Sequence, residues 1–422
     1  MKQAVRIGWL WVVGLGVVAA ATPKDPTPEL LKQVDAMKPA LVETRRHFHA
    51  HPELSNREVE TGKELARRLT AMGYAAQTGV AGHGVTATLQ GGHPGPLVAW
   101  RTDIDALPVT EAVDSPFKSQ NPGVMHACGH DVHMTVALGV AALLMKNRAT
   151  IPGSVKFIFQ PAEEGPPAGE EGGASLMIKQ GVLEPRPVAI LGLHTAPDLK
   201  VGDVATVAGP LMAAADRFRL TVRGKGAHGA QPHNGVDAVY VGSQIVGALQ
   251  SVVSRRNDAR RPLVVTVGSF HAGTRFNILA EEATLEGTIR TLDPQSHAAA
   301  PKEMSRIVDG ICTAHGATCT FENTVLAPVL VNDPALYALA QTTLDKTLGR
   351  DHLKAATPMM IAEDFGFYAQ QVPALFLMLG VGNPDKGITA GLHSPNYQAD
   401  EEALAVGVRL ASSLIVARLR AR

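Results

Sequence analysis

Short apolar strands alternate with helices along the first half of the chain, and polar residues follow each strand where it ends. The pattern predicts buried strands over 97–100, 155–160 and 189–193, which lead to Asp103 and Asp105, to Glu163 and Glu164, and to His194. In open α/β sheets, ligands bind beyond the carboxyl ends of the strands. We therefore expect an α/β domain whose polar groups meet at one edge of a sheet.

The pattern changes near Val204, and the change predicts a second domain. The segment 206–324 alternates strands with long helices and is expected to form a self-contained α+β unit. After it, a helix over 334–348, a strand over 374–379 and a final helix from Glu401 return to the first pattern. Since 422 residues exceed one ordinary core, we predict a first domain of residues 28–205 and 325–422, with a mixed sheet flanked by helices, and an inserted domain of residues 206–324.

The first 21 residues have the pattern of a secretory signal peptide. Lys2 and Arg6 precede an apolar run over 7–18, and three alanines follow it at 19–21. The run is shorter than the roughly 20 residues of a spanning helix, although a retained single-span anchor is the alternative. The expected location is periplasmic or secreted, without membrane contact after cleavage.

Cysteine usage and charge add two further expectations. An exported chain permits a disulfide between Cys312 and Cys319, and two buried free thiols are the alternative. Lysine plus arginine equal aspartate plus glutamate at 39 each. A nucleic-acid partner, which requires a basic surface, is therefore not expected.

The run 125–133 holds three histidines, one thiol and one carboxylate, which are groups that bind zinc and other divalent ions. Cys128 and His130 are two apart and can point into one site, and Glu164, His194 and His393 would complete two metal sites with a shared group. A turn with a buried cysteine and surface histidines is the alternative. Glu163 would stay free for proton transfer, unless the Glu163–Glu164 pair is a solvated acidic loop.

Seven ordered motifs resemble one known group of enzymes. They are His126-Ala127-Cys128-Gly129-His130-Asp131, Gln160-Pro161-Ala162-Glu163-Glu164, Leu193-His194-Thr195, Gly224-Lys225-Gly226-Ala227-His228, Gly287-Thr288-Ile289-Arg290, Ala362-Glu363-Asp364-Phe365 and Leu392-His393-Ser394-Pro395. From about Pro28 to its end, the chain resembles amidohydrolases of the hippuricase and indoleacetyl-amino-acid hydrolase type. That group belongs to the metallopeptidase superfamily of aminoacylase and carboxypeptidase G.

The resemblance implies a role for each matching residue. The metal ligands would be Cys128, His130, Glu164, His194 and His393, with Glu163 as general acid and base. Asp105 would orient a ligating histidine, and His126 and His133 would only support the site. His228 would contact the substrate carbonyl oxygen, in relatives often across a dimer interface, while Asn277 and Arg290 would hold the substrate carboxylate. Glu363 and Asp364 would line the site or cap a helix.

The resemblance also implies cofactors and assembly. We expect two divalent metal ions per subunit, zinc or manganese first and cobalt or nickel as further options. The inserted domain would act as a lid and form a homodimer. Two positions depart from the relatives: Asp103 stands where related branches have a metal-binding histidine, and Ile278-Leu279-Ala280 replaces Val-Ile-Pro. The second change is expected to alter a turn and not the chemistry.

These observations predict an exported, metal-dependent hydrolase that cleaves N-acyl amino acids, such as hippurate-like conjugates, with metal-activated water. A carboxypeptidase or dipeptidase acting on short peptides is one alternative. A cysteine amidase with Cys128 as nucleophile and His130 or His133 as base is a second, although it leaves the acidic pair without a task. A non-catalytic module that binds metal or carboxylate is a third. No residue type in the sequence is diagnostic for the acyl group.

Overall fold

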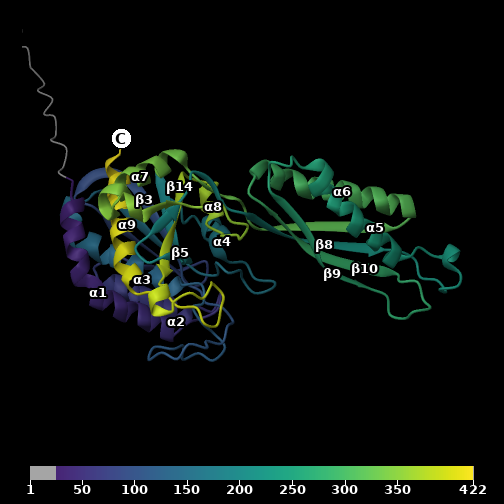
Figure 1. Ribbon diagram of the computed structural model, residues 1–422, viewed down its shortest axis with the longest axis horizontal. Helices are drawn as coiled ribbons and strands as arrows, with labels where there is room; N and C mark the ends of the chain where they lie inside the picture. The colour runs from purple at the N-terminus through teal and green to yellow at the C-terminus, as the bar shows by residue number, and fades with distance from the viewer. Residues whose placement is uncertain (1–24, 422) are drawn as a thin grey trace, which may run out of the picture.

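The computed structural model describes residues 25–421, so the predicted signal peptide over 1–21 lies outside the described residues. The chain forms a larger α/β part and a smaller part made by a central segment of the sequence (Figure 1). The expected fold class, a mixed sheet flanked by helices with an inserted α+β unit, is confirmed. Among the described residues, no helix combines the length and apolar character needed to span a membrane.

The larger part is built on an eight-stranded sheet of order β1-β2-β4-β3-β5-β14-β6-β13. Its strands are β1 (Gln77–Val80), β2 (Gly84–Gln90), β3 (His93–Asp103), β4 (Pro152–Gln160), β5 (Ala189–Lys200), β6 (Val204–Thr206), β13 (Leu353–Ala355) and β14 (Ala374–Gly382). The four central strands β4, β3, β5 and β14 are parallel, and β1 and β2 pair antiparallel with their neighbours. β6 pairs antiparallel with β14 and parallel with β13. Parallel central strands bring the ends of β3, β4 and β5 to one edge.

Helices cover both faces of this sheet, which explains why its central strands are continuously apolar. Trp100, Phe157, Leu191 and Leu377 face one core, and their neighbours Ala99, Ile158, Ile190 and Phe376 face the other. The first core includes residues of α1 (Thr27–Ala50), α2 (Val59–Ala71), α3 (His130–Lys146), α7 (Pro334–Leu348) and α9 (Glu402–Arg420). The second core includes residues of the short helices α4 (Gly173–Lys179) and α8 (Gly366–Ala369).

The smaller part is a four-stranded antiparallel sheet of order β11-β8-β10-β9. Its elements are β8 (Ala214–Arg223), α5 (Ala238–Ser251), β9 (Leu263–Ala272), β10 (Glu282–Thr291), α6 (Pro294–His315) and β11 (Thr318–Ala327). Both helices pack on one face of the sheet (Figure 1). A disulfide joins Cys312 in the last turns of α6 to Cys319 in β11, which is the first of the two expected alternatives.

The two crossings between the parts lie side by side. β7 (Gly209–Met212) leads out of the larger part, and β12 (Leu330–Asn332) returns to it and pairs with β7. The predicted boundaries at 206 and 325 fall within a few residues of this pair, and they stay predictions. One expected strand end is wrong: β5 does not end at His194 but continues to Lys200, because its ladder with β14 continues as far as the pair Lys200 and Gly382.

Candidate metal centre and active site

The predicted site residues gather at the carboxyl edge of the parallel strands. Asp103 is the last residue of β3, Glu163 and Glu164 form a turn just after β4, and His194 lies within β5. The helix α3 begins at the same edge with His130. The expectation that separate strand ends share one edge is therefore confirmed by the parallel order β4-β3-β5.

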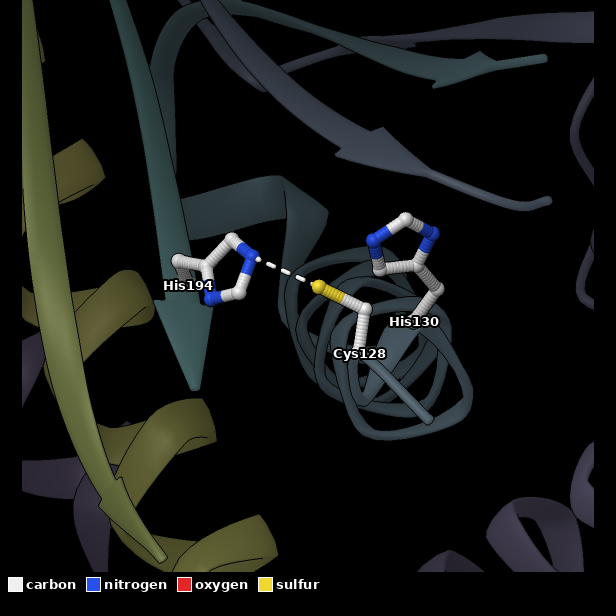
Figure 2. A group of neighbouring side chains, drawn as sticks. All are labelled: Cys128, His130 and His194. Carbon is white, nitrogen blue, oxygen red and sulfur yellow. Dashed lines mark hydrogen bonds between the residues drawn. The ribbon is translucent and has the colours of Figure 1, made fainter. Parts of the chain in front are cut away.

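Cys128, His130 and His194 form the buried centre of the site (Figure 2). The Cys128 Sγ lies 3.3 Å from His194 Nε2. Gly129, between the cysteine and His130, has a φ of 86°, so the chain turns sharply enough for both side chains to face the same space. These three residues are at most 6% exposed.

Hydrogen bonds fix how the two imidazoles present their nitrogens. His130 donates from Nδ1 to the carbonyl oxygen of Asp105 at 2.8 Å, and His194 donates from Nδ1 to the carbonyl oxygen of Thr195 at 2.8 Å. Each ring therefore keeps the Nε2 lone pair for another partner, as metal-binding histidines do. Within the described part of the chain, the buried Nε2 of His130 has no hydrogen-bond partner.

Glu164 and His393 extend this cluster toward solvent. His393 Nε2 lies 3.4 Å from Glu164 Oε1, and its side chain is 54% exposed. The backbone N–H of His393 donates to Ala127 at 2.9 Å, which ties its loop to the cysteine loop. His393 also has a φ of 61°, a conformation that residues with a Cβ rarely adopt and that occurs often at functional sites.

The donor atoms of these five residues fit a pair of divalent cations. They form two overlapping groups that share the thiol, Cys128 with His130 and His194, and Cys128 with Glu164 and His393, and within each group the atoms lie within 4.8 Å of one another. Thiolate, imidazole and carboxylate together suit zinc and also other divalent ions. The structure thus brings all five predicted ligands together, and their role as ligands stays a prediction.

The electrostatics of the cluster also favour a cation. Burial and the charges of Glu164 and Glu163 raise the pKa of the Cys128 thiol well above its ordinary value. Burial alone would lower the pKa of His130, yet Asp103, Asp105 and Glu164 raise it to about 10. Both pKa shifts indicate a negative electrostatic potential at the site. A bound cation would offset this potential and would keep the Cys128 thiol and the His130 imidazole deprotonated. The raised thiol pKa also opposes the alternative in which Cys128 is a free nucleophile.

Glu163 lies beside the cluster, with its Oε2 4.0 Å from His130 Nε2. Burial, together with the carboxylates of Glu363 and Glu164, raises its pKa well above the ordinary value. A carboxyl group that holds a proton more tightly than an ordinary glutamate can take a proton up and later pass it on, which suits general acid–base work. The alternative of a solvated acidic loop does not fit, because the side chain is only 8% exposed.

A buried guanidinium holds the acidic residues behind Glu163. Arg101 contacts Asp103 at 2.9 Å, Glu363 at 3.1 Å and Asp364 at 2.7 Å, and it is 1% exposed. Asp364 accepts the N–H of Ala174 at 2.7 Å, so it caps α4 and also lines the site. Sequence reasoning gave Arg101 no role. Its position within an apolar strand could have predicted a role, because a buried charge requires partners of opposite charge.

Asp105, His133 and His126 occupy supporting positions. Asp105 Oδ1 lies 3.3 Å from His130 Nδ1, and Oδ2 accepts the N–H of Glu164 at 3.0 Å. His133 donates to Asp103 at 2.6 Å and accepts the N–H of Thr195 at 2.8 Å. Both of its ring nitrogens are therefore used, and it has no lone pair for a metal. His126 is buried without a hydrogen-bond partner among the described residues.

A cavity of about 440 Å³ opens over the cluster at the junction of the two parts. One wall carries Cys128, Glu163, Glu164, His194 and His393, and Arg290 from the end of β10 lies in the same lining. Burial lowers the pKa of Arg290. His228 and Asn277 are absent from this lining. They are neighbours near the other end of β8 and β10, where Gly229 N–H donates to Asn277 O at 2.9 Å.

A pair of overlapping donor groups with an adjacent carboxyl group, at the edge of an α/β sheet, defines a metal-dependent hydrolase. The chain belongs to peptidase family M20/M25/M40, which residues 99–417 match. It is 38% identical over 394 residues to thermostable carboxypeptidase 2 of Saccharolobus solfataricus, covering 93% of this chain and 98% of that protein. It is 38% identical over 377 residues to N-acetylcysteine deacetylase of Bacillus subtilis, covering 89% and 96%.

Solved structures agree with this assignment. The Bacillus subtilis YXEP protein, a dinuclear metal binding peptidase from the M20 family, matches with a TM-score of 0.80 at 35% identity, covering 92% of this chain and 99% of that one. The resemblance stated from the motifs is thus confirmed. The protein is a metal-dependent amidohydrolase or peptidase with residue clusters able to bind metal.

Proposed function

We propose that the protein hydrolyses the amide bond of N-acyl amino acids and uses two divalent cations per subunit, zinc or manganese. The observation that carries this proposal is the single cavity in which the donor cluster, the free carboxyl group of Glu163 and the guanidinium of Arg290 meet. Hydrolysis of an N-acyl amino acid needs three matching groups: a Lewis acid that polarises the scissile carbonyl, a group that transfers protons, and a cation that pairs with the substrate carboxylate.

The residues divide this work. Cys128, His130, Glu164, His194 and His393 would hold a cation pair, which would supply Lewis acidity at the scissile carbonyl and lower the pKa of the attacking water. Glu163 accepts the proton of the water and delivers it to the leaving amine, since its raised pKa lets it hold that proton in between. Arg290 pairs with the α-carboxylate of the substrate through its planar guanidinium, which fixes the distance from that end to the scissile bond.

The assembly and location belong to the same proposal. A homodimer would bring His228 and Asn277 of one subunit to the cavity of the other, because within one chain they lie beyond the outer end of β8. Export to the periplasm or medium is supported by the signal-like segment of residues 1–21 and by the disulfide of Cys312 and Cys319, which persists in oxidising compartments.

Release of free amino acid from hippurate-like substrates tests the proposal. We expect activity in protein reconstituted with zinc, manganese, cobalt or nickel, and loss of activity after chelation. Glu163→Gln keeps the size of the side chain but cannot move the proton, so it should lower kcat by about 10²- to 10⁴-fold while metal content is unchanged. Full activity of metal-free protein, or of Glu163→Gln, would refute the proposal.

A carboxypeptidase acting on short peptides is the second candidate, favoured by the similarity to thermostable carboxypeptidase 2. The cavity would admit a peptide whose C-terminal carboxylate pairs with Arg290. An N-blocked dipeptide and hippurate, assayed side by side with the same metal, separate the two candidates. A kcat/KM that is higher for the dipeptide favours the carboxypeptidase.

A further inference from the structure

Four consecutive side chains between α1 and α2 contact the loop that follows β4 and carries Glu163 and Glu164, or contact Asp105, which supports this loop. Ser55 Oγ donates to Asp105 Oδ2 at 2.7 Å, and the same oxygen accepts the N–H of Glu164. Asn56 donates to the carbonyl oxygen of Glu171 at 3.0 Å. The segment 55–58 therefore contacts both ends of the loop that follows β4.

Arg57 and Glu58 make the other two contacts, Arg57 at the surface and Glu58 in the interior. Arg57 pairs with Glu170 at 2.6 Å, and both side chains are exposed, so this contact contributes little to stability. Glu58 is 0% exposed, and its Oε1 accepts the N–H of Ala162 at 2.8 Å. A hydrogen bond from the backbone to a buried carboxyl group is much less screened by water, so Glu58 is the main contact of the segment.

Ala162 is the residue at which the chain turns toward Glu163. It has a φ of 53° and is 1% exposed. For a residue with a Cβ, this left-handed conformation costs about 1 kcal/mol or more, and it persists only where its surroundings enforce it. The hydrogen bond to Glu58 is a contact that enforces it. If Ala162 relaxed, the backbone directions of Glu163 and Glu164 would both change.

The segment is itself held in place at its start. The carboxylate of Glu53 accepts the N–H of Thr61 at 2.8 Å, which joins it to the first turn of α2. The carbonyl oxygen of Glu53 accepts the N–H of Ala106 at 2.8 Å, just after Asp105. Glu58 therefore reaches Ala162 from a fixed position, as positioning a catalytic group requires.

We propose that Glu58 is a positioning residue of the active site, which acts through the Ala162 N–H to orient the acid–base group Glu163 and the ligand Glu164. The role of Glu163 in this proposal rests on the proposed function, while the orientation of Glu164 is testable without turnover. Glu58 itself touches neither the cavity nor the donor cluster.

Two substitutions of Glu58 distinguish the effect of its hydrogen bond from the effect of its packing volume. Glu58→Gln keeps an oxygen that can accept from Ala162, whereas Glu58→Leu fills a similar volume without an acceptor. We expect Glu58→Leu to lower kcat by about 10- to 100-fold with KM within about threefold, because misplacing a catalytic group acts on the chemical step. Glu58→Gln should stay within about threefold of the wild type. Glu60→Leu, an exposed position in the same region, is the matched control and should change nothing.

Absorption of the cobalt-substituted protein gives a readout independent of turnover. In Glu58→Leu the visible bands of the bound cobalt should shift because Glu164 has moved, while the protein still binds the same amount of cobalt. If Glu163→Gln is fully active but Glu58→Leu still shifts the cobalt bands, the proposed function fails and the positioning role stands.

Three results would overturn the positioning role. One is a Glu58→Leu protein with kcat within about threefold of the wild type and an unchanged cobalt spectrum. Another is a loss in Glu58→Gln equal to that in Glu58→Leu. Should Glu58→Leu fail to fold, hydrogen exchange on the unmodified protein decides the matter: we expect the Ala162 amide to be protected, and exchange at the rate of a free amide contradicts the proposal.

Discussion

At the scale of single residues, the buried carboxyl groups of the site differ in whether a cation faces them. Asp103, Glu363 and Asp364 face Arg101, and Glu164 faces His393. Glu58 has no such partner: one oxygen accepts the Ala162 N–H, and the other is buried without a hydrogen-bond partner among the described residues. Burial and the nearby charge of Asp105 raise its pKa to about 7. This carboxyl group should therefore make folding depend on pH.

We predict the sign of that dependence from the two pKa values. In the unfolded chain Glu58 titrates near 4.5, and in the folded protein near 7. The folded state thus binds more protons between these values, so the contribution is fully present below about pH 4.5 and is lost as the pH rises through about 7. The loss amounts to roughly 3 kcal/mol, and Glu58→Gln should remove it.

Urea unfolding at pH 5 and pH 8, with chelator in every sample, measures this effect. The wild type should lose more unfolding free energy between the two pH values than Glu58→Gln does. Other titrating groups are common to both proteins and cancel in the difference. Equal pH dependence in the two proteins would show that Glu58 is charged in the folded state at neutral pH.

At the scale of elements, the start of α3 determines where two predicted ligands point. Gly129 is the residue before the helix, with a φ of 86°. A Cβ at this position would lie 2.5 Å from Thr195 Oγ1 and 2.5 Å from the hydroxyl oxygen of Tyr397. Cys128 and His130 flank it directly, so any backbone shift here moves both donor atoms.

We predict that Gly129→Ala lowers the unfolding free energy by about 2–4 kcal/mol and weakens metal binding, because it combines an unfavourable φ with a steric clash. Gly123→Ala is the matched control. Gly123 has a similar φ of 80°, but nothing lies within 4 Å of its added Cβ, so it should cost only about 1 kcal/mol. Urea unfolding and a cobalt titration of both variants test this, and equal effects in the two would contradict the clash.

The elements also show what sequence patterns can predict. The strands ending near Asp103 and Glu163 were predicted because both faces of the sheet are buried and their segments are continuously apolar. The strands β6, β7, β12 and β13 were not, because each has only three or four residues and depends on a distant partner. Asp364 was expected to line the site or to cap a helix, and it does both, but the helix that it caps is α4, which lies far away in sequence.

The same limit applies within the site. The five metal-ligand candidates were recognisable by residue type, and Glu164 also by its position just after a strand. Glu58 and Ser55 were not, since their role depends on hydrogen bonds to Ala162 and Asp105 across 104 and 50 residues of sequence. Local composition carries no information about such contacts.

At the scale of the whole molecule, the two parts supply different ends of the predicted substrate site. Arg290 and Ala215, at the inner end of the small sheet, line the cavity over the metal cluster. His228 follows the outer end of β8, and Asn277 precedes the outer end of β10. The ten residues of β8 span about 30 Å between these ends. Within one chain, His228 is therefore too far away to contact a substrate bound at Glu163.

A dimer resolves this distance if each subunit supplies His228 to the cavity of the other, and mixing two inactive variants tests it. Glu163→Gln and His228→Ala should each be inactive alone. After unfolding and refolding together, half of the dimers contain one chain of each, and one of their two cavities combines an intact Glu163 with an intact His228 from the other chain. We expect about a quarter of wild-type activity from an equal mixture. If His228 acts within its own chain, the mixture stays inactive, and a monomer in sedimentation experiments would exclude the shared site.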